Sequence, residues 1–134
     1  MINLQILIPL IITTIVAVVG WYIAHFLSFK RDRANKRREL RIQYLIEAYR
    51  RIERAANRPK NFDNNKELES AISDIQLFGT KKQAKLAEQF AYEIAHKSNA
   101  STDELLIDLR QDLRAELDLE QLPSEITYLR LDKG

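Results

Sequence analysis

The sequence predicts an all-α protein in which a single N-terminal transmembrane helix precedes a small antiparallel bundle of about four helices. Three observations support this fold class. No charged side chain occurs between Leu4 and Phe29. Beyond that run, apolar side chains recur at the 3.6-residue spacing of amphipathic helices. The chain has only three glycines and three prolines, which leaves little material for β-hairpins or long linkers.

We expect residues 1–29 to form a transmembrane anchor. The uncharged run from Leu4 to Phe29 exceeds the roughly 20 residues that a membrane-spanning helix needs. Trp21 and Tyr22 lie near its C-terminal side, as in an interfacial aromatic belt. The alternative is a cleaved signal peptide, but no basic residue precedes the run and a basic cluster follows it. A buried core helix is disfavoured because the run is long and carries no charge.

Residues 30–41 are expected to form a basic juxtamembrane segment that continues into the bundle. Its basic residues are Lys30, Arg31, Arg33, Lys36, Arg37, Arg38 and Arg41. Because basic flanks stay in the cytoplasm, we expect the N-terminus outside and the C-terminal domain inside. The cluster can also contact anionic lipid headgroups. A nucleic-acid interface is the alternative, but the segment has no aromatic side chain for base stacking, so no nucleic-acid partner is expected.

Small residues follow one face of the predicted anchor at steps of four, three, four and four. They are Thr13, Ala17, Gly20, Ala24 and Ser28. Such a face lets two helix backbones approach closely, so we predict association there with a second copy or with another membrane subunit. The alternative is that these small residues have no role in association, because small residues are common in membrane helices.

Residues 42–122 are expected to form a cytoplasmic helical bundle. Apolar side chains from Ile42 to Ala56 follow one helix face, and neither glycine nor proline separates this helix from the anchor. Residues 42–60 carry a net charge of +3 and residues 61–134 a net charge of −6. The last predicted helix is acidic, and we expect it to lie beside the basic first helix. Such pairing aids topology more than stability, because exposed ion pairs contribute only ~0–1 kcal/mol.

Local signals predict where the later helices begin and end. Asn64, Thr80 and Ser101 each precede a Glu or Gln by three residues, which is the spacing of a capping box. Gly79 is placed to end the second helix in a left-handed conformation.

Residues 123–134 form a tail that is more apolar than a free terminus usually is. It either packs back across the bundle or remains exposed until a partner covers it. The possible partner contacts on the bundle and the tail are Tyr49, Ile52, Ile126, Tyr128, Leu129 and Leu131.

No residue set in the sequence indicates a reaction. There is no phosphate-binding glycine loop, no Ser-His-Asp set, and no cysteine for a thiolate site or a nucleophile. Glu93 and His96 have the Glu-x-x-His spacing of di-iron bundles, but the other histidine, His25, lies at the predicted membrane boundary. We therefore expect no enzymatic activity, no catalytic residue, no cofactor or metal, and no small-molecule substrate.

The segments RRELRIQYLIEAYRRIERAANR, LESAISDIQLFGT and LLIDLRQDLRAEL resemble a group of small uncharacterised bacterial proteins. Those proteins have one N-terminal membrane helix and a short helical cytoplasmic domain. The resemblance covers nearly the whole chain and rests on overall pattern. It implies a bacterial inner (cytoplasmic) membrane location, and it implies no activity and no site residue.

The sequence predicts a membrane-anchored, non-enzymatic interaction or scaffold module on the cytoplasmic face. Such a module self-associates or docks a protein partner, because anchoring raises the local concentration. One alternative is an accessory subunit of a larger membrane enzyme, transporter or defence complex. A second alternative is a small membrane-active toxin, against which a folded domain argues.

Overall fold

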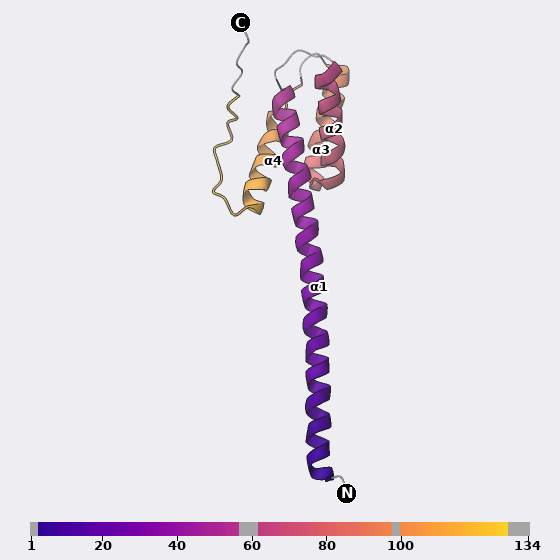
Figure 1. Cartoon of the computed structure of the whole chain (residues 1–134). Coiled ribbons are helices and arrows are strands. Elements are labelled where there is room, and N and C mark those ends of the chain that lie inside the picture. Colours follow the sequence, from indigo (N-terminus) through magenta and orange to yellow (C-terminus); the bar gives the residue numbers. More distant parts are fainter. Residues whose placement is uncertain (1–2, 57–61, 98–99, 129–134) are drawn as a thin grey trace. The chain divides into compact units, whose positions relative to one another are not determined.

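The computed structural model describes residues 3–56, 62–97 and 100–128. Within these ranges the chain forms four α-helices and no strand, which confirms the predicted all-α class (Figure 1). The helices are α1 (Leu4–Ala55), α2 (Phe62–Phe78), α3 (Lys81–His96) and α4 (Asp103–Glu116). The chain divides into two compact units, Met1–Glu39 and Leu40–Gly134.

The first unit contains the N-terminal part of α1. This helix continues without a break for 52 residues, so residues 1–29 do not form a helix of their own. All side chains from residue 3 to residue 40 are exposed. The hydroxyls of Thr13 and Thr14 donate to the Leu10 carbonyl oxygen at 2.9 and 2.8 Å. These polar groups are therefore satisfied within the helix, as an apolar environment requires.

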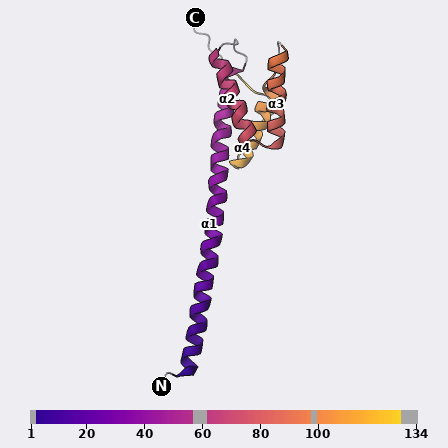
Figure 2. The ribbon, with the colours of Figure 1, turned by 90° about the vertical axis from the view of Figure 1, so that its right-hand side faces the viewer.

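The second unit is a helical bundle around one apolar core. The core side chains are Leu45, Ala48 and Ile52 of α1, Ala71 and Ile75 of α2, Ala87 of α3, and Leu105, Leu106, Leu109 and Leu113 of α4. Two residues join α2 to α3, which pack against each other, and α4 packs on α3 (Figure 2). Every helix thus buries one apolar stripe, and this burial is the main favourable term in folding.

The capping signal at Thr80 is confirmed, and the other two are wrong. Gln83 N donates to Thr80 Oγ1 at 3.2 Å, and Thr80 N donates to Gln83 Oε1 at 2.8 Å. Asn64 lies inside α2, which begins two residues earlier. The N-cap of α4 is Thr102, whose side chain forms no capping hydrogen bond. Thr102 is buried and its side chain hydrogen-bonds to Tyr128, while Ser101 Oγ accepts the Asp103 N–H at 3.2 Å.

Gly79 lies between α2 and α3, and the predicted left-handed conformation is wrong. Neither of the two glycines in the described residues has a positive φ angle. A Cβ atom on Gly79 would lie 2.5 Å from the Ile75 carbonyl oxygen and 3.2 Å from Gln83 Cβ. The same carbonyl accepts the Gly79 N–H at 2.8 Å. Glycine is therefore required here because the backbone of α2 and the side chain of Gln83 leave no room for a methyl group.

Gly79→Ala is expected to lower the free energy of unfolding by about 1–3 kcal/mol, because the methyl group must displace a backbone carbonyl or a buried glutamine. Thermal unfolding of the full chain in detergent measures this loss. Gln76→Ala is the matched control, since Gln76 is an exposed residue of the same helix, α2. Equal melting temperatures for the two variants would contradict the steric explanation.

Candidate functional site

The strongest polar cluster of the bundle joins α1 to α4. We define the polar junction as Arg41, Gln83, Asp112 and Glu116. Arg41 Nη2 lies 2.6 Å from Asp112 Oδ2, and Arg41 Nη1 lies 3.2 Å from Glu116 Oε1. Arg41 Nε donates to the Phe78 carbonyl oxygen at 3.1 Å, so one guanidinium group links the ends of α2 and α4 to α1.

Gln83 completes the polar junction from α3. Its side chain is fully buried, and its Nε2 donates to Asp112 Oδ2 at 3.0 Å. The Asp112 oxygen therefore accepts from two donors, and the Gln83 Oε1 accepts from Thr80 N. A buried polar group is tolerated when all of its partners are present. The polar junction thus specifies how four helix segments meet, and its donors and acceptors are used in that structural role.

This geometry confirms part of the predicted pairing between the first and last helices and corrects the assignment of Arg41. Arg41 pairs with Asp112 and Glu116 as expected. Asp108, however, pairs with Lys82 of α3, and this hydrogen bond and the Asp108 charge raise the pKa of Lys82. Arg41 is also reassigned from the membrane-surface cluster to the bundle, because its side chain is only 24% exposed.

Ion pairs between α1 and α2 lie outside the expectations drawn from the sequence. Arg51 Nη1 lies 2.7 Å from Asp74 Oδ2 and donates to Ser70 Oγ at 3.1 Å. Arg54 Nη2 lies 3.2 Å from Glu67 Oε2. Glu67 and Asp74 are seven residues apart and therefore share a helix face. Arg51 and Arg54 also lie on one face of their own helix. Two acidic residues on one helix face and two basic residues on another are the sequence signal for this interface.

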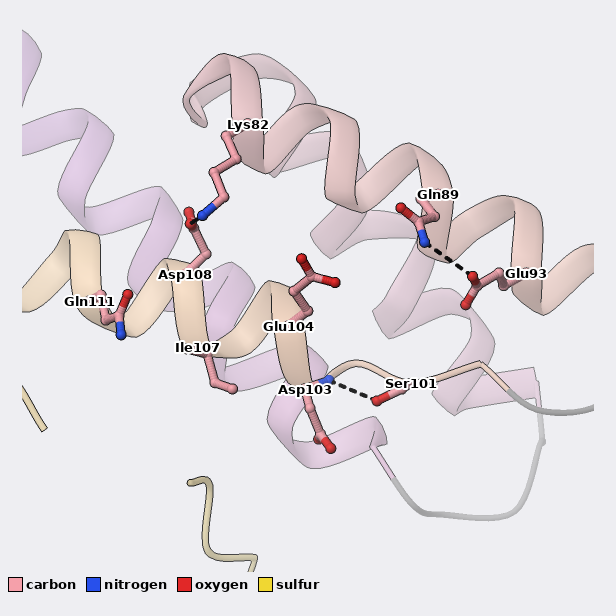
Figure 3. Close-up of a pocket in the computed structure, with 9 residues that line it drawn as sticks. All are labelled: Lys82, Gln89, Glu93, Ser101, Asp103, Glu104, Ile107, Asp108 and Gln111. Carbon is pink, nitrogen blue, oxygen red and sulfur yellow. Dashed lines mark hydrogen bonds and ion pairs between the residues drawn. The ribbon is translucent and has the colours of Figure 1, made fainter. Parts of the chain in front are cut away.

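A surface pocket of about 520 Å³ lies between α3 and α4 (Figure 3). Its lining residues are Lys82, Gln89, Glu93, Ser101, Asp103, Glu104, Ile107, Asp108 and Gln111. Lys82 Nζ forms an ion pair with Asp108 Oδ1, and Gln89 Nε2 donates to Glu93 Oε1 at 3.2 Å. In residues 3–56, 62–97 and 100–128, no three His, Asp or Glu side chains are grouped so that they could hold a metal ion.

Glu93 and His96 engage different partners. Glu93 contacts Gln89, and its Oε1 lies 3.9 Å from Lys97 Nζ. His96 Nδ1 lies 2.9 Å from the Tyr92 carbonyl oxygen, and its ring stacks on that of Tyr92 with centroids 4.2 Å apart. These contacts describe a histidine that completes the last turn of α3.

The predicted membrane-helix residues lie on the exposed part of α1. Thr13, Ala17, Gly20, Ala24 and Ser28 are all exposed. Trp21 stacks on His25 with ring centroids 5.5 Å apart, and the Arg33 guanidinium lies 5.8 Å from the Phe29 ring centroid. The face of small residues is thus available to a second helix.

The predicted partner contacts divide into three groups. Ile52 is fully buried and belongs to the core, so its assignment as a partner contact is corrected. Tyr49, Ile126 and Tyr128 are half-buried and pack against that core. Leu129 and Leu131 lie outside the described residues. Ile126 and Tyr128 thus pack on the bundle, as the first of the two interpretations expects, whereas residues 123–125 and 127 are exposed.

Tyr128 joins the tail to α4 through a titratable hydroxyl group. Its hydroxyl donates to Asp103 Oδ1 at 2.8 Å. Burial is the largest cause that raises the pKa of Tyr128 from 10.0 to about 12; a hydrogen bond with Thr102 lowers it and the Asp103 bond raises it. Burial also raises the pKa of Tyr49. Because the folded pKa of Tyr128 exceeds the unfolded one, its stabilisation is complete below pH 10 and is lost as the pH rises toward about 12; that of Tyr49 is lost in the same direction.

We expect the melting temperature of the full chain to fall between pH 10 and about pH 12. Tyr128→Phe should make this fall shallower, because phenylalanine keeps the ring packing and has no proton to lose. Tyr92→Phe is the control, since Tyr92 is 61% exposed. If the melting temperatures of the wild type and Tyr128→Phe fall in parallel as the pH rises, Tyr128 is not the group responsible.

Comparison with known protein families, with curated proteins and with solved structures finds no match to this chain. The resemblance to small bacterial membrane proteins thus rests on sequence pattern alone. Function is therefore argued from the chemistry of the residues described above.

Proposed function

We propose that this chain is a membrane-anchored, non-enzymatic interaction module. In this proposal the N-terminal part of α1 spans a membrane and the helical bundle lies on its cytoplasmic side. Within the described residues one helix, α1, is long and apolar enough to cross a membrane. The module acts by self-association or by docking a protein partner at the membrane.

The observation that carries the proposal is the exposure of the uncharged stretch of α1. Fifteen Leu, Ile, Val and Phe side chains between Leu4 and Phe29 are exposed, and none of the strongly apolar window is buried. A core helix of a soluble domain would be mostly buried. On the insertion scale such residues contribute about −0.3 to −0.6 kcal/mol each, so their sum favours the membrane by roughly 5–9 kcal/mol.

The basic residues beside this stretch support the orientation. Those that remain in the cluster after Arg41 is reassigned are Lys30, Arg31, Arg33, Lys36, Arg37 and Arg38, and all are exposed. Residues 1–29 contain no Lys or Arg. The positive-inside bias therefore favours a cytoplasmic bundle and an N-terminus outside. The bacterial inner membrane is the location that the resemblance implies.

Self-association through the small-residue face of α1 is the proposed activity. A Cβ atom at Gly20 would meet nothing within 4 Å. No other part of the described chain therefore covers the position at which a second helix backbone could approach most closely. In lipid, helices associate through close backbone approach, for which glycine and alanine are the favoured residues. The partner helix is that of a second copy or of another membrane subunit.

In-cell crosslinking of the full chain, recovered through a C-terminal tag, tests the proposal. We expect self-crosslinked product from the wild type and a loss of at least several-fold in Gly20→Leu, because the larger side chain separates the backbones. Val19→Leu, which lies off the small-residue face, is the matched control. Equal product from all three chains, or recovery of the chain in the soluble fraction, would refute the proposal.

A second candidate, an accessory subunit of a larger membrane complex, is favoured by apolar surface on the bundle. Leu77 is 74% exposed and Leu40 is 47% exposed. Tyr44, also exposed, stacks on Phe78 with ring centroids 4.3 Å apart. Exposed large apolar side chains are residues that a partner could cover. Recovery of one other protein by the same tag, unaffected by Gly20→Leu, would favour this candidate.

A further inference from the structure

Basic and acidic side chains lie on different sides of α1 directly after the apolar stretch. Lys30, Arg33 and Arg37 follow one another at steps of three and four, which places them on one helix face. We define the basic stripe as these three residues, all of which are exposed. Asp32 and Glu39 are seven residues apart and share another face. Neither is three or four positions from a residue of the basic stripe, the spacing at which helix side chains meet.

The positive charge of the basic stripe is not balanced within the chain. In the described part of the chain, none of its three residues forms an ion pair with a carboxylate. Later basic residues of α1 differ in this respect, since Arg41 pairs with Asp112 and Arg51 pairs with Asp74. The charge of the basic stripe is therefore available to an anionic group outside the chain.

The side chains of the basic stripe reach back toward the apolar stretch. In an α-helix the Cα–Cβ bonds tilt toward the N-terminus. Arg33 shows this direction, because its guanidinium lies 5.8 Å from the ring centroid of Phe29, four residues earlier. At a rise of 1.5 Å per residue, the Cα atoms of Arg33 and Arg37 lie about 6 and 12 Å beyond that of Phe29. Side chains that point back from these positions reach the layer of lipid headgroups, roughly 5–7 Å thick, beside the hydrocarbon core.

We propose that the basic stripe is a binding surface for the phosphate groups of anionic phospholipids, and that it gathers these lipids around the anchor. Arginine binds phosphate oxygens through paired N–H groups, and lysine binds them as a point charge. The net charge of an anionic headgroup adds an attraction that a zwitterionic headgroup lacks. This inference rests on the proposed function and deepens it, because it names the class of lipid that the anchored chain selects.

Trp21 provides the measurement, since it is the one tryptophan of the chain and lies in the apolar stretch nine residues before Lys30. Bromine atoms on lipid chains quench its fluorescence on contact, so quenching reports which lipids surround the anchor. The full-length chain is reconstituted in vesicles of phosphatidylcholine with a minor fraction of phosphatidylglycerol. In two otherwise identical preparations, either the phosphatidylglycerol or an equal number of phosphatidylcholine molecules carry bromine. We expect the anionic label to quench more strongly, by about twofold or more.

Glutamine in place of all three residues of the basic stripe should bring the ratio of the two quenching values close to one. The matched control also replaces three exposed basic residues with glutamine, but these lie in the bundle: Lys66, Lys81 and Lys85. It changes the net charge of the chain by the same amount and should leave the ratio unchanged. Equal ratios for the two variants would overturn the inference, because net charge and not the basic stripe would then attract the lipid.

A second variant keeps the basic stripe intact and therefore does not depend on how its loss affects insertion. Asp32→Asn combined with Glu39→Gln removes the two acidic side chains that repel anionic headgroups beside the stripe. The ratio of the two quenching values should rise above that of the wild type. A ratio that falls or stays the same would contradict an electrostatic selection of lipids at this segment.

Vesicles made entirely of brominated phosphatidylcholine separate this inference from the proposed function. Strong quenching of Trp21 in these vesicles places the apolar stretch among lipid chains. If the anionic and zwitterionic labels then quench equally in the mixed vesicles, lipid selection is refuted and the membrane anchor stands. If Trp21 is not quenched even in the fully brominated vesicles, the anchor is refuted and this inference with it.

Discussion

A chain with arginine in place of both Val16 and Val19 is expected to move from the membrane pellet to the soluble fraction or to be degraded. Arginine at the centre of a membrane-spanning helix costs about 2.5–3.5 kcal/mol per residue on the insertion scale, so the pair costs roughly 5–7 kcal/mol. That cost is similar to the gain of roughly 5–9 kcal/mol from the fifteen large apolar side chains of the stretch. Insertion should therefore become unfavourable or marginal.

The measurement is the fraction of the chain that resists alkaline extraction from membranes. Replacing the same two valines with leucine is the matched control, and it should leave the pelleted fraction unchanged because leucine is at least as apolar. If the arginine pair stays in the pellet to the same extent as the leucine pair, the stretch of α1 from Leu4 to Phe29 is not the anchor.

Asp112→Ala is expected to cost about 2–3 kcal/mol of folding stability. The substitution removes the acceptor of both Arg41 and the fully buried Gln83. A buried pair that loses one partner costs about 3–5 kcal/mol, and an exposed one at most about 1 kcal/mol. Arg41 and Asp112 are 24 and 25% exposed, which places the expected loss between these limits.

Asp108→Ala is the matched control for Asp112→Ala. It removes the same side chain one turn earlier on the same helix. Asp108 itself is 16% exposed, but its partner Lys82 is 70% exposed and remains solvated when the carboxylate is removed. Its expected cost is therefore smaller than that of Asp112→Ala. Chemical unfolding of the full chain in detergent, followed by circular dichroism, compares the two variants. Equal losses would show that the polar junction adds nothing beyond a surface ion pair.

Local signals succeeded where a neighbouring residue in the sequence completes the interaction. The capping box at Thr80 needs only Gln83, three residues away, and both hydrogen bonds form. The same spacing failed at Asn64 and at Ser101, because in each case the bundle places the helix start elsewhere. At α4 the N-cap is Thr102, which is buried and hydrogen-bonds to Tyr128, a residue far away in the sequence.

Residues whose roles depend on distant partners were assigned less well. Arg41 belongs to a run of basic residues in the sequence, yet Asp112 and Glu116, more than seventy positions away, bind it within the bundle. Ile52 lies on a helix stripe that suits either a core or a partner surface, and it is fully buried. Gly79 is needed for its closeness to Ile75 and Gln83 rather than for its backbone conformation.

By itself the sequence determined the helical class, the uncharged stretch of α1 and the adjacent basic residues. These features depend on composition and on spacing within one helix, which are local properties. Only the tertiary structure decided which charges are paired, which apolar residues form the core, and where the tail lies. Those outcomes depend on contacts between residues far apart in the chain, and such contacts form only when the helices have packed.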